Sequence, residues 1–496
     1  MTAEVQATVE QAKRLAALGR IDQALALLAD VTARADAPWQ TLSVHADLLK
    51  RAGRLEESAD LSRRLVALRP QSVPARHNLA STLGDLGRAE AAEATCRETL
   101  AIGGDAPETW LVLARALQAQ NRFDAAQTAY GEALARRPGY ADALRDLSQL
   151  IWMQGAGLEA ACAPLDRAIA AAPGEPVLRQ IKARLLDYAG QPQAAYQVLT
   201  AGALDAPGEL AAAQATQRLD PERALAHADR AAVMAGGPVI AVLVVQAECR
   251  LALGQAAAAM VHIDTLRRIA PTNQHVLACQ ATAWRMLGDP RYDQMYDYDA
   301  FVRPYRLEAL SGWASLEAYL VDLAQALHGL HGLKAHPIGQ SLRGGSQTTA
   351  KLSESRDPAI LAFFQVIDAP IRAYMAALGP GEDPLRARNT GDYRLQGSWS
   401  VRLHPHGFHA DHIHAEGWLS SACHIELPSS VTGADEGREG WLRFGAPPGV
   451  PTLEAQHHVR PQPGTLVIFP SYMWHGTQPF GGDETRLTLA FDVVPA

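Results

Sequence analysis

The 496-residue sequence is poor in cysteine and lacks like-charge runs and long apolar segments. No apolar run approaches the roughly 20 residues that cross a bilayer, so we expect no membrane span. The N-terminus has no basic region followed by an apolar stretch, so we predict no secretory signal. The cysteines are odd in number and widely spaced, which argues against a disulfide framework or a zinc site. They predict free thiols in a reducing cytoplasm: Cys96, Cys162, Cys249, Cys279 and Cys423.

The sequence also lacks a large excess of charge of either sign. The formal net charge is -8, and this balance argues against a nucleic-acid partner, which usually meets a basic surface. With 48% hydrophobic and 20% charged residues, the composition is that of a soluble globular protein. The length exceeds what one hydrophobic core normally supports, so we expect two or three domains.

A periodic pattern fills the first 290 residues. Turn residues recur every 34 positions at first and then with small shifts: Gly19, Gly53, Gly87, Asn121, Gly155, Gly190, Asp220, Gly254 and Gly288. Five residues later an alanine recurs: Ala24, Ala92, Ala126, Ala160, Ala195 and Ala259. Seventeen residues after some turns stands a proline: Pro70, Pro138 and Pro271. Glycine relieves a tight turn, alanine lets two helices approach, and proline stops a helix, so we predict helix–turn–helix units.

This period and these three markers resemble the tetratricopeptide repeat. The resemblance implies an all-α solenoid over residues 1–290, whose concave face holds a peptide segment. A solenoid that serves only as a spacer or a dimer interface is the alternative.

The repeat pattern ends after Gly288. The Tyr-rich segment "DPRYDQMYDYDAFVRPYRLEA" replaces the repeats, and we interpret it as a hinge. Apolar spacing predicts a helix over 316–330 and one or two helices over 358–378, broken near Pro370. We therefore assign residues 291–390 to a hinge with helices that support the last domain.

Short strands between glycines and prolines follow from residue 391 to the end. They read "SWSVRLHP", "WLSSACHIELP", "GWLRFGAP", "GTLVIFP" and "TRLTLAFDVV". Such strands predict an antiparallel jelly roll, or double-stranded β-helix, over 391–496 with helices outside it. The predicted fold is thus a multidomain α + β chain, a helical solenoid followed by a jelly roll.

The stretch "FHADHIHAEGW" is the densest group of metal-ligand side chains. Side chains two apart in a strand share a face, so His412 pairs with His414 and His409 pairs with Asp411 on the opposite face. Farther on, "FPSYMWHGTQPF" supplies His475, and "ETRLTLAFDVV" supplies Arg486, with Thr488 and Ala490 on the face of the arginine.

The order of "HIHAEGWLSSACHI", "PQPGTLVIFPSYMWH" and "ETRLTLAF" resembles the Fe(II)/2-oxoglutarate-dependent oxygenases over about 390–496. The resemblance implies Fe(II), 2-oxoglutarate as co-substrate and O2. It makes His412 and His475 metal ligands and Arg486, with Thr488, the site for the far carboxylate of 2-oxoglutarate. His414 stands where most of these enzymes have a carboxylate.

Three hypotheses follow for the remaining ligand. His414 is a third nitrogen ligand, water fills its place, or His409 and Asp411 make the pair instead. The gap-free spacing from "HIH" to "LSSACHI" favours His412 and His414, and we then expect Asp411 to orient a ligand histidine.

The stretch "HPIGQSLRGGSQTT" resembles a segment that precedes the barrel in repeat-bearing oxygenases. It makes Gln340, Arg343 and Gln347 candidates to meet the substrate or support the ligands, with a Gly-rich surface loop as the alternative. Trp399 and Arg402 are further candidates.

Two function classes remain. The first is an enzyme that hydroxylates a peptide or protein side chain docked with help of the repeats. The second is a protein-interaction scaffold with an inactive barrel, favoured by the missing carboxylate at 414. A metal cupin with other chemistry would explain the histidines but not Arg486.

Overall fold

The computed structural model describes residues 3–308, 312–349, 351–433 and 437–496. The chain folds into two compact units, Met1–Leu150 and Ile151–Ala496. The first unit is all helical, and each of the helices α1 to α7 packs against the next along the chain. The helices are α1 (Ala3–Ala17), α2 (Ile21–Ala33), α3 (Trp39–Arg51), α4 (Leu55–Leu68), α5 (Val73–Asp85), α6 (Ala89–Ala101), α7 (Pro107–Ala119), α8 (Phe123–Arg136) and α9 (Ala141–Met153), which crosses into the second unit.

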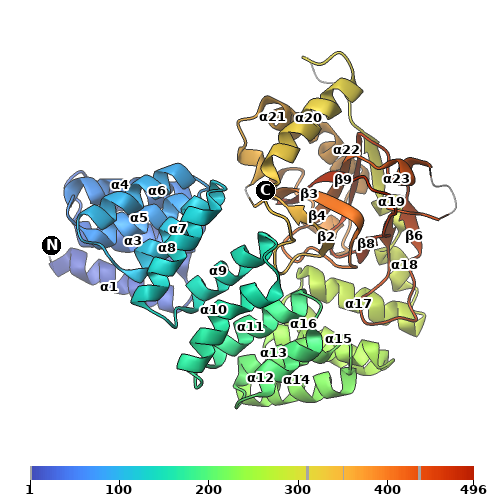
Figure 1. Cartoon of the computed structure of the whole chain (residues 1–496), viewed down its shortest axis with the longest axis horizontal. Helices are drawn as coiled ribbons and strands as arrows, with labels where there is room; N and C mark the ends of the chain where they lie inside the picture. The colour runs from blue at the N-terminus through green and yellow to red at the C-terminus, as the bar shows by residue number, and fades with distance from the viewer. Residues whose placement is uncertain (1–2, 309–311, 350, 434–436) are drawn as a thin grey trace. The chain divides into compact units, whose positions relative to one another are not determined.

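The second unit joins the remaining repeats to the C-terminal sheets (Figure 1). Its repeat helices also pack in chain order. They are α10 (Leu158–Ala171), α11 (Pro176–Tyr188), α12 (Pro192–Thr200), α13 (Ala206–Thr216), α14 (Pro221–Ala235), α15 (Ile240–Ala252), α16 (Ala256–Ile269) and α17 (Gln274–Leu287). The predicted solenoid of helical hairpins is confirmed, while the domain boundaries at 290 and 390 stay predictions.

The repeat turns need a left-handed backbone. Gly19, Gly53, Gly87 and the other turn glycines have φ between 66° and 79°, and Asn121 has φ 57°. Asp220 is the exception to this pattern. It has φ -150° and caps α14, because its carboxylate accepts a hydrogen bond from the Arg223 amide at 3.0 Å.

The recurrent alanines lie in the helix contacts, with one shift in phase. Ala24, Ala92 and Ala126 are fully buried, whereas Ala160 is exposed and its neighbour Ala161 is buried. The turn before α10 contains an extra residue, so the helix starts three residues after Gly155 instead of two. Each predicted stop proline follows a helix end by two residues: Pro70 after α4, Pro138 after α8 and Pro271 after α16.

The C-terminal part contains two antiparallel sheets that form the jelly roll. The larger has the strand order β1-β7-β4-β9-β3-β2 and the smaller β6-β5-β8. The strands are β1 (Arg303–Arg306), β2 (Leu342–Gln347), β3 (Tyr393–His409), β4 (Leu419–Glu426), β5 (Leu442–Phe444), β6 (His457–Val459), β7 (Thr465–Pro470), β8 (His475–Thr477) and β9 (Arg486–Pro495). The helices around them are α18 (Arg291–Met295), α19 (Tyr298–Phe301), α20 (Leu316–Leu330), α21 (Pro358–Val366), α22 (Asp368–Leu378) and α23 (Ser429–Gly433).

Two segments differ from their sequence interpretation. The Tyr-rich segment, expected as a hinge, contains β1, an edge strand that pairs with β7. The Gly-rich segment is not a loop, because β2 pairs with β3. A Cβ on Gly345 would lie 2.5 Å from the Arg402 carbonyl oxygen, so only glycine fits where this pairing shifts register.

One helical stretch among the described residues, Pro358–Leu378, is long and apolar enough to cross a membrane. This finding corrects the expectation that no run approaches that length. The stretch comprises α21 and α22, and Phe363 and Tyr374 are fully buried in the core shared with β7 and β9. Core helices of soluble proteins pass the same test, so the stretch is weak evidence for a membrane span.

Backbone contacts join the later repeats to the jelly roll within the second unit. The amides of Lys334 and Ala335 both donate to the Met153 carbonyl oxygen at the end of α9. Arg285 of α17 donates to the Gly445 carbonyl at 2.6 Å, and Trp474 donates to Thr282 Oγ1 of α17 at 3.0 Å. These contacts fix one face of the solenoid beside the mouth of the jelly roll.

Candidate active site

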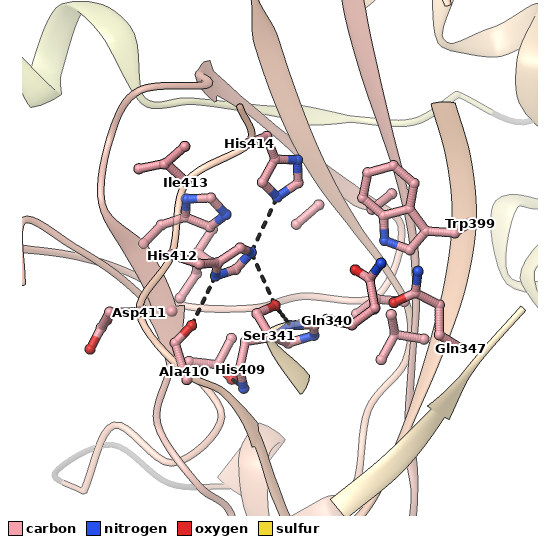
Figure 2. A pocket seen from close by; sticks show the side chains of 18 of the residues that line it. Gln340, Ser341, Gln347, Trp399, His409, Ala410, Asp411, His412, Ile413 and His414 are labelled. Carbon is pink, nitrogen blue, oxygen red and sulfur yellow. Dashed lines mark hydrogen bonds between the residues drawn. The ribbon is translucent and has the colours of Figure 1, made fainter. Parts of the chain in front are cut away.

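A cavity of about 560 Å³ opens inside the jelly roll. Its walls come from β2, β3, β4, β8 and β9 and from the segment after β3 (Figure 2). The side chains that line it include those of His412, His414, His475, Arg486 and Thr488. The structure therefore brings together residues that are up to about 75 positions apart in the sequence.

Three imidazoles meet on one side of this cavity. One ring nitrogen from each of His412, His414 and His475 lies within 4.8 Å of the other two. The ring centroids of His412 and His475 are 4.2 Å apart, because their backbones form an isolated antiparallel bridge. His412 and His414 lie beyond the end of β3 rather than inside a strand, yet their rings meet in the cavity.

Each imidazole is oriented through its Nδ1 atom. His412 Nδ1 donates to the Ala410 carbonyl at 2.8 Å, and His475 Nδ1 donates to the Met473 carbonyl at 2.9 Å. His414 Nδ1 donates to Asp492 Oδ1 at 2.7 Å. Since a carbonyl or carboxylate can only accept, the proton of each neutral ring is on Nδ1, and each Nε2 is left as a lone pair.

These lone pairs face one another. The Nε2 atoms of His412 and His414 are 3.2 Å apart, as Figure 2 shows. Burial holds the pKa of His412 and that of His475 well below the usual range, and neighbouring imidazoles add to the effect. Two acceptors at this distance repel each other unless a cation lies between them, so the donor set fits a metal ion.

Two carboxylates of the cavity lining, Asp411 and Asp492, each have a partner in the structure. Asp411 does not orient a ligand histidine. It forms a two-pronged ion pair with Arg443, with Arg443 Nε 3.0 Å from Asp411 Oδ1. Asp492 takes the orienting position instead. Among the described residues, the gathered ligand atoms are all imidazole nitrogens.

His409, the other member of the alternative pair, lies beside the cluster. Its Nδ1 is 2.9 Å from Ser341 Oγ, and the same hydroxyl is 3.1 Å from His412 Nε2. His409 therefore contacts the cluster through a serine while Asp411 points to Arg443. The structure does not bring these two side chains together at the three gathered nitrogens.

Arg486 is a buried guanidinium without an acidic partner among the described residues. It is 2% exposed, and its Nη1 donates to the Gly440 carbonyl at 2.6 Å. Its Nε has no hydrogen-bond partner, nor does Nε2 of the adjacent His424. Burial lowers the pKa of Arg486 to about 10, so the group stays charged at neutral pH. A buried, unpaired cation is costly, and a carboxylate ligand would relieve that cost.

Thr488 lies one step along β9 from Arg486 on the same face, and Asp492 lies two steps further. Asp492, Ser341 and His424 were not predicted from the sequence. The alternation that places Arg486, Thr488 and Ala490 on one face extends by one more step to Asp492. Ser341 and His424 carried no comparable signal.

The side of the cavity away from the imidazoles is polar and aromatic. Gln340, Gln347 and Trp399 line it, and Figure 2 shows the two carboxamides beside the indole. Arg343 also lines the cavity. The Trp399 ring lies 5.5 Å from that of His414.

The candidate Arg402 lies outside the cavity lining. Its side chain donates to the His331 carbonyl at 3.2 Å.

A second cavity of about 1010 Å³ continues from the first. It is lined by α11, α13, α15 and α17 and by the segment after β3. The two cavities share Tyr188, Arg218, Gly339 and His412 in their walls. We call this second cavity the repeat groove, and it leads from the solenoid to the imidazole cluster.

Two segments match known protein families. Residues 397–492 match the model described as "Putative 2OG-Fe(II) oxygenase", and residues 111–176 match a tetratricopeptide repeat model. No curated protein matches the chain significantly.

Several solved tetratricopeptide proteins are similar to parts of the chain. One from Parabacteroides merdae ATCC 43184 is 16% identical with a TM-score of 0.35, covering 49% of this chain and 98% of its own. One from Thermus thermophilus is 21% identical with a TM-score of 0.31, covering 36% and 98%. MamA from Desulfovibrio magneticus RS-1 is 14% identical with a TM-score of 0.32, covering 34% and 96%. The family models thus find a tetratricopeptide repeat within residues 111–176 and a putative 2-oxoglutarate/Fe(II) oxygenase domain within residues 397–492.

Proposed function

We propose that the protein is an Fe(II)- and 2-oxoglutarate-dependent dioxygenase that hydroxylates a peptide or protein side chain. One observation supports this most strongly. Three imidazoles with their Nδ1 atoms occupied gather their remaining ring nitrogens at one point, in the same cavity as a buried arginine that has no acidic partner among the described residues.

His412, His414 and His475 would hold the iron through Nε2. When bound there, Fe(II) supplies the activation of O2 that is coupled to the oxidative decarboxylation of 2-oxoglutarate. Asp492 keeps His414 in the tautomer that leaves Nε2 free, and the two backbone carbonyls do the same for His412 and His475. Ser341 would give up its contact with His412 Nε2 and keep its bond to His409.

Arg486 would bind the far carboxylate of 2-oxoglutarate. Its planar fork suits a carboxylate, and the Gly440 carbonyl fixes the orientation of the guanidinium. Thr488 lines the same wall and offers a hydroxyl beside the arginine. The pKa of His424 is held well below its usual range by burial and by Arg486, so this ring is neutral and adds no competing charge.

The substrate would enter through the repeat groove. Its walls come from the solenoid on one side and from the segment that carries His412 on the other. A polypeptide docked along α11 to α17 can therefore place one side chain in the cavity. There it would meet Gln340, Gln347 and Trp399 opposite the imidazoles.

The cysteines are consistent with a cytoplasmic protein. All five are free and buried. Thiols persist in this state in a reducing compartment, so we place the protein in the cytoplasm.

Turnover tests this proposal. The full chain with Fe(II), 2-oxoglutarate and O2 should form succinate, and succinate formation should rise when a substrate protein is added. Mass spectrometry should find that this protein gains one oxygen atom on a side chain. His475→Ala should abolish both signals. A candidate substrate can come from comparing the proteomes of cells with and without the enzyme.

An inactive barrel on a repeat scaffold is the second candidate. The specific observation in its favour is the absence of a carboxylate among the ligand atoms gathered by the described residues, since Asp411 is committed to Arg443. This candidate predicts that proteins bind the repeat groove while no succinate forms with any of them.

A further inference from the structure

A second group of metal-ligand side chains lies in the wall of the repeat groove. Glu248 of α15 and His275 and Cys279 of α17 place one ligand atom each within 4.8 Å of one another. Glu248 and His275 line the groove, and Cys279 lies behind them with 1% exposure. This group is outside the imidazole cluster and has no part in the proposed reaction.

Local structure fixes the geometry of the group. Asn273 caps α17, accepting a hydrogen bond from the Val276 amide at 3.1 Å, so the helix starts just before His275. His275 and Cys279 are four residues apart and therefore share one face of α17. That face packs against α15, which supplies Glu248.

Hydrogen bonds connect the three side chains. His275 Nε2 is 2.7 Å from Glu248 Oε1, and Cys279 lies within hydrogen-bonding reach of His275. Trp474 places its ring edge-on at 5.9 Å from that of His275, and its own Nε1 is bound to Thr282. The imidazole is thus held between a carboxylate, a thiol and an indole.

We propose that Glu248, His275 and Cys279 form a second metal site, suited to Zn²⁺. Thiolate, imidazole and carboxylate are the ligands that Zn²⁺ takes in proteins. The ligand set includes a sulfur, which the imidazole cluster lacks, so it selects a softer ion than the first site does. Sequence spacing gave no indication of this site, because Glu248 and His275 are 27 residues apart and lie on two different helices.

Three protein ligands leave a coordination position open, and the exposed side of this group is the repeat groove. Binding would displace the thiol proton of Cys279 and the proton shared by His275 and Glu248, and both protons would pass to solvent. With a thiolate and a carboxylate as ligands, the bound Zn²⁺ would have no net charge left, but it would place a Lewis acid in the groove wall. It would then offer its open position to water or to a donor group of a docked polypeptide.

Cobalt(II) alone is the probe, added to the full chain under anaerobic conditions. A cobalt–thiolate bond gives near-ultraviolet charge-transfer absorption that an all-imidazole site cannot give. We expect this band at one equivalent in the His412→Ala/His475→Ala variant, which lacks the first site, and in the wild type once enough cobalt is added to fill both sites. Zn²⁺ should displace the cobalt and remove the band.

Variants of the second site and a matched control complete the test. Cys279→Ser should remove the band, and Glu248→Gln should weaken cobalt affinity roughly tenfold or more. Cys249→Ser, a buried cysteine of α15 outside the group, should keep both. If Cys279→Ser is misfolded by circular dichroism, Glu248→Gln decides, since its side chain lines the groove.

Absence of the band in the wild type, or its persistence without Cys279, overturns the proposal. Neither result depends on Fe(II), 2-oxoglutarate or turnover, so failure of this inference is distinguishable from failure of the oxygenase function.

Discussion

Asp492 shows how one side chain prepares a ligand. Its carboxylate accepts a hydrogen bond from Nδ1 of His414 and so leaves Nε2 free for a metal. We expect Asp492→Asn to lower Fe(II) affinity by roughly 10–100-fold, because an amide holds the required tautomer less well. Equilibrium dialysis with Fe(II) under anaerobic conditions measures this change.

Asp411 provides the contrast, because it tests which pair of residues binds the metal. Its carboxylate is paired with Arg443. We expect Asp411→Asn to leave Fe(II) affinity within a few-fold of wild type, and His414→Ala to reduce it strongly. Metal loss on the Asp411 change alone would instead support the pair His409 and Asp411.

His331 makes the jelly roll sensitive to acid. It is 7% exposed between Ser346 and Ser400, and burial, with a contribution from Arg402, lowers its pKa to about 3. The unfolded chain, with a pKa near 6.5, binds the proton first, so stability is lost as pH falls below about 6.5 towards the folded pKa.

The test compares urea unfolding at pH 7.5 and at pH 5.5. Between these values we expect His331→Gln to lose about 1.4 kcal/mol less stability than wild type. Equal losses in the two proteins would show that His331 is not the residue responsible.

At the scale of elements, β2 depends on glycine. A Cβ at Gly345 would meet backbone atoms of Arg402, which cannot move without breaking β3. We expect Gly345→Ala to displace Arg343 and Gln347, raising the KM for the protein substrate while Fe(II) binding is retained. Gly329→Ala is the control, because that helical position of α20 has nothing within 4 Å of the added Cβ. Equal KM values for the two variants would contradict this role of β2.

Regular elements could be predicted from the sequence, and irregular ones could not. The helix 316–330 coincides with α20, because its apolar spacing follows the helical period. β1 and β2 were missed, since an edge strand with proline and a glycine-containing bulge do not show strand alternation. The break between the helices predicted over 358–378 lies at Ile367, three residues before Pro370. Pro370 falls in the first turn of α22, where a helix tolerates proline.

The residues of the candidate site also fall into those that the sequence predicted and those that it did not. Residues carried by motifs, such as His412, His475 and Arg486, lie in one cavity. Ser341 and His424 act through contacts that join segments far apart in the sequence, and a single sequence contains no signal for such contacts. The partner of Asp411 was missed for this reason too, because Arg443 lies on a different strand.

At the scale of the whole molecule, the repeat groove should decide which polypeptides react. Ala241 of α15 lines the groove and is exposed, so a larger side chain there would fill it. We expect Ala241→Trp to raise the KM for a protein substrate about tenfold or more, while 2-oxoglutarate binding is unchanged.

Ala235→Trp is the matched control for this prediction. Ala235 is also exposed, at the end of α14, and it does not line the groove. A similar rise in KM for both variants would indicate a general loss of stability rather than a blocked groove.

The central claim is that one cavity holds a metal on three imidazoles and 2-oxoglutarate on Arg486. The most direct measurement is the visible charge-transfer band that forms when anaerobic protein receives Fe(II) and then 2-oxoglutarate. We predict the band in wild type and in Arg402→Met. Arg486→Met should lose the band while it still binds Fe(II), and His475→Ala should lose both. An undiminished band in Arg486→Met or in His475→Ala would contradict the account.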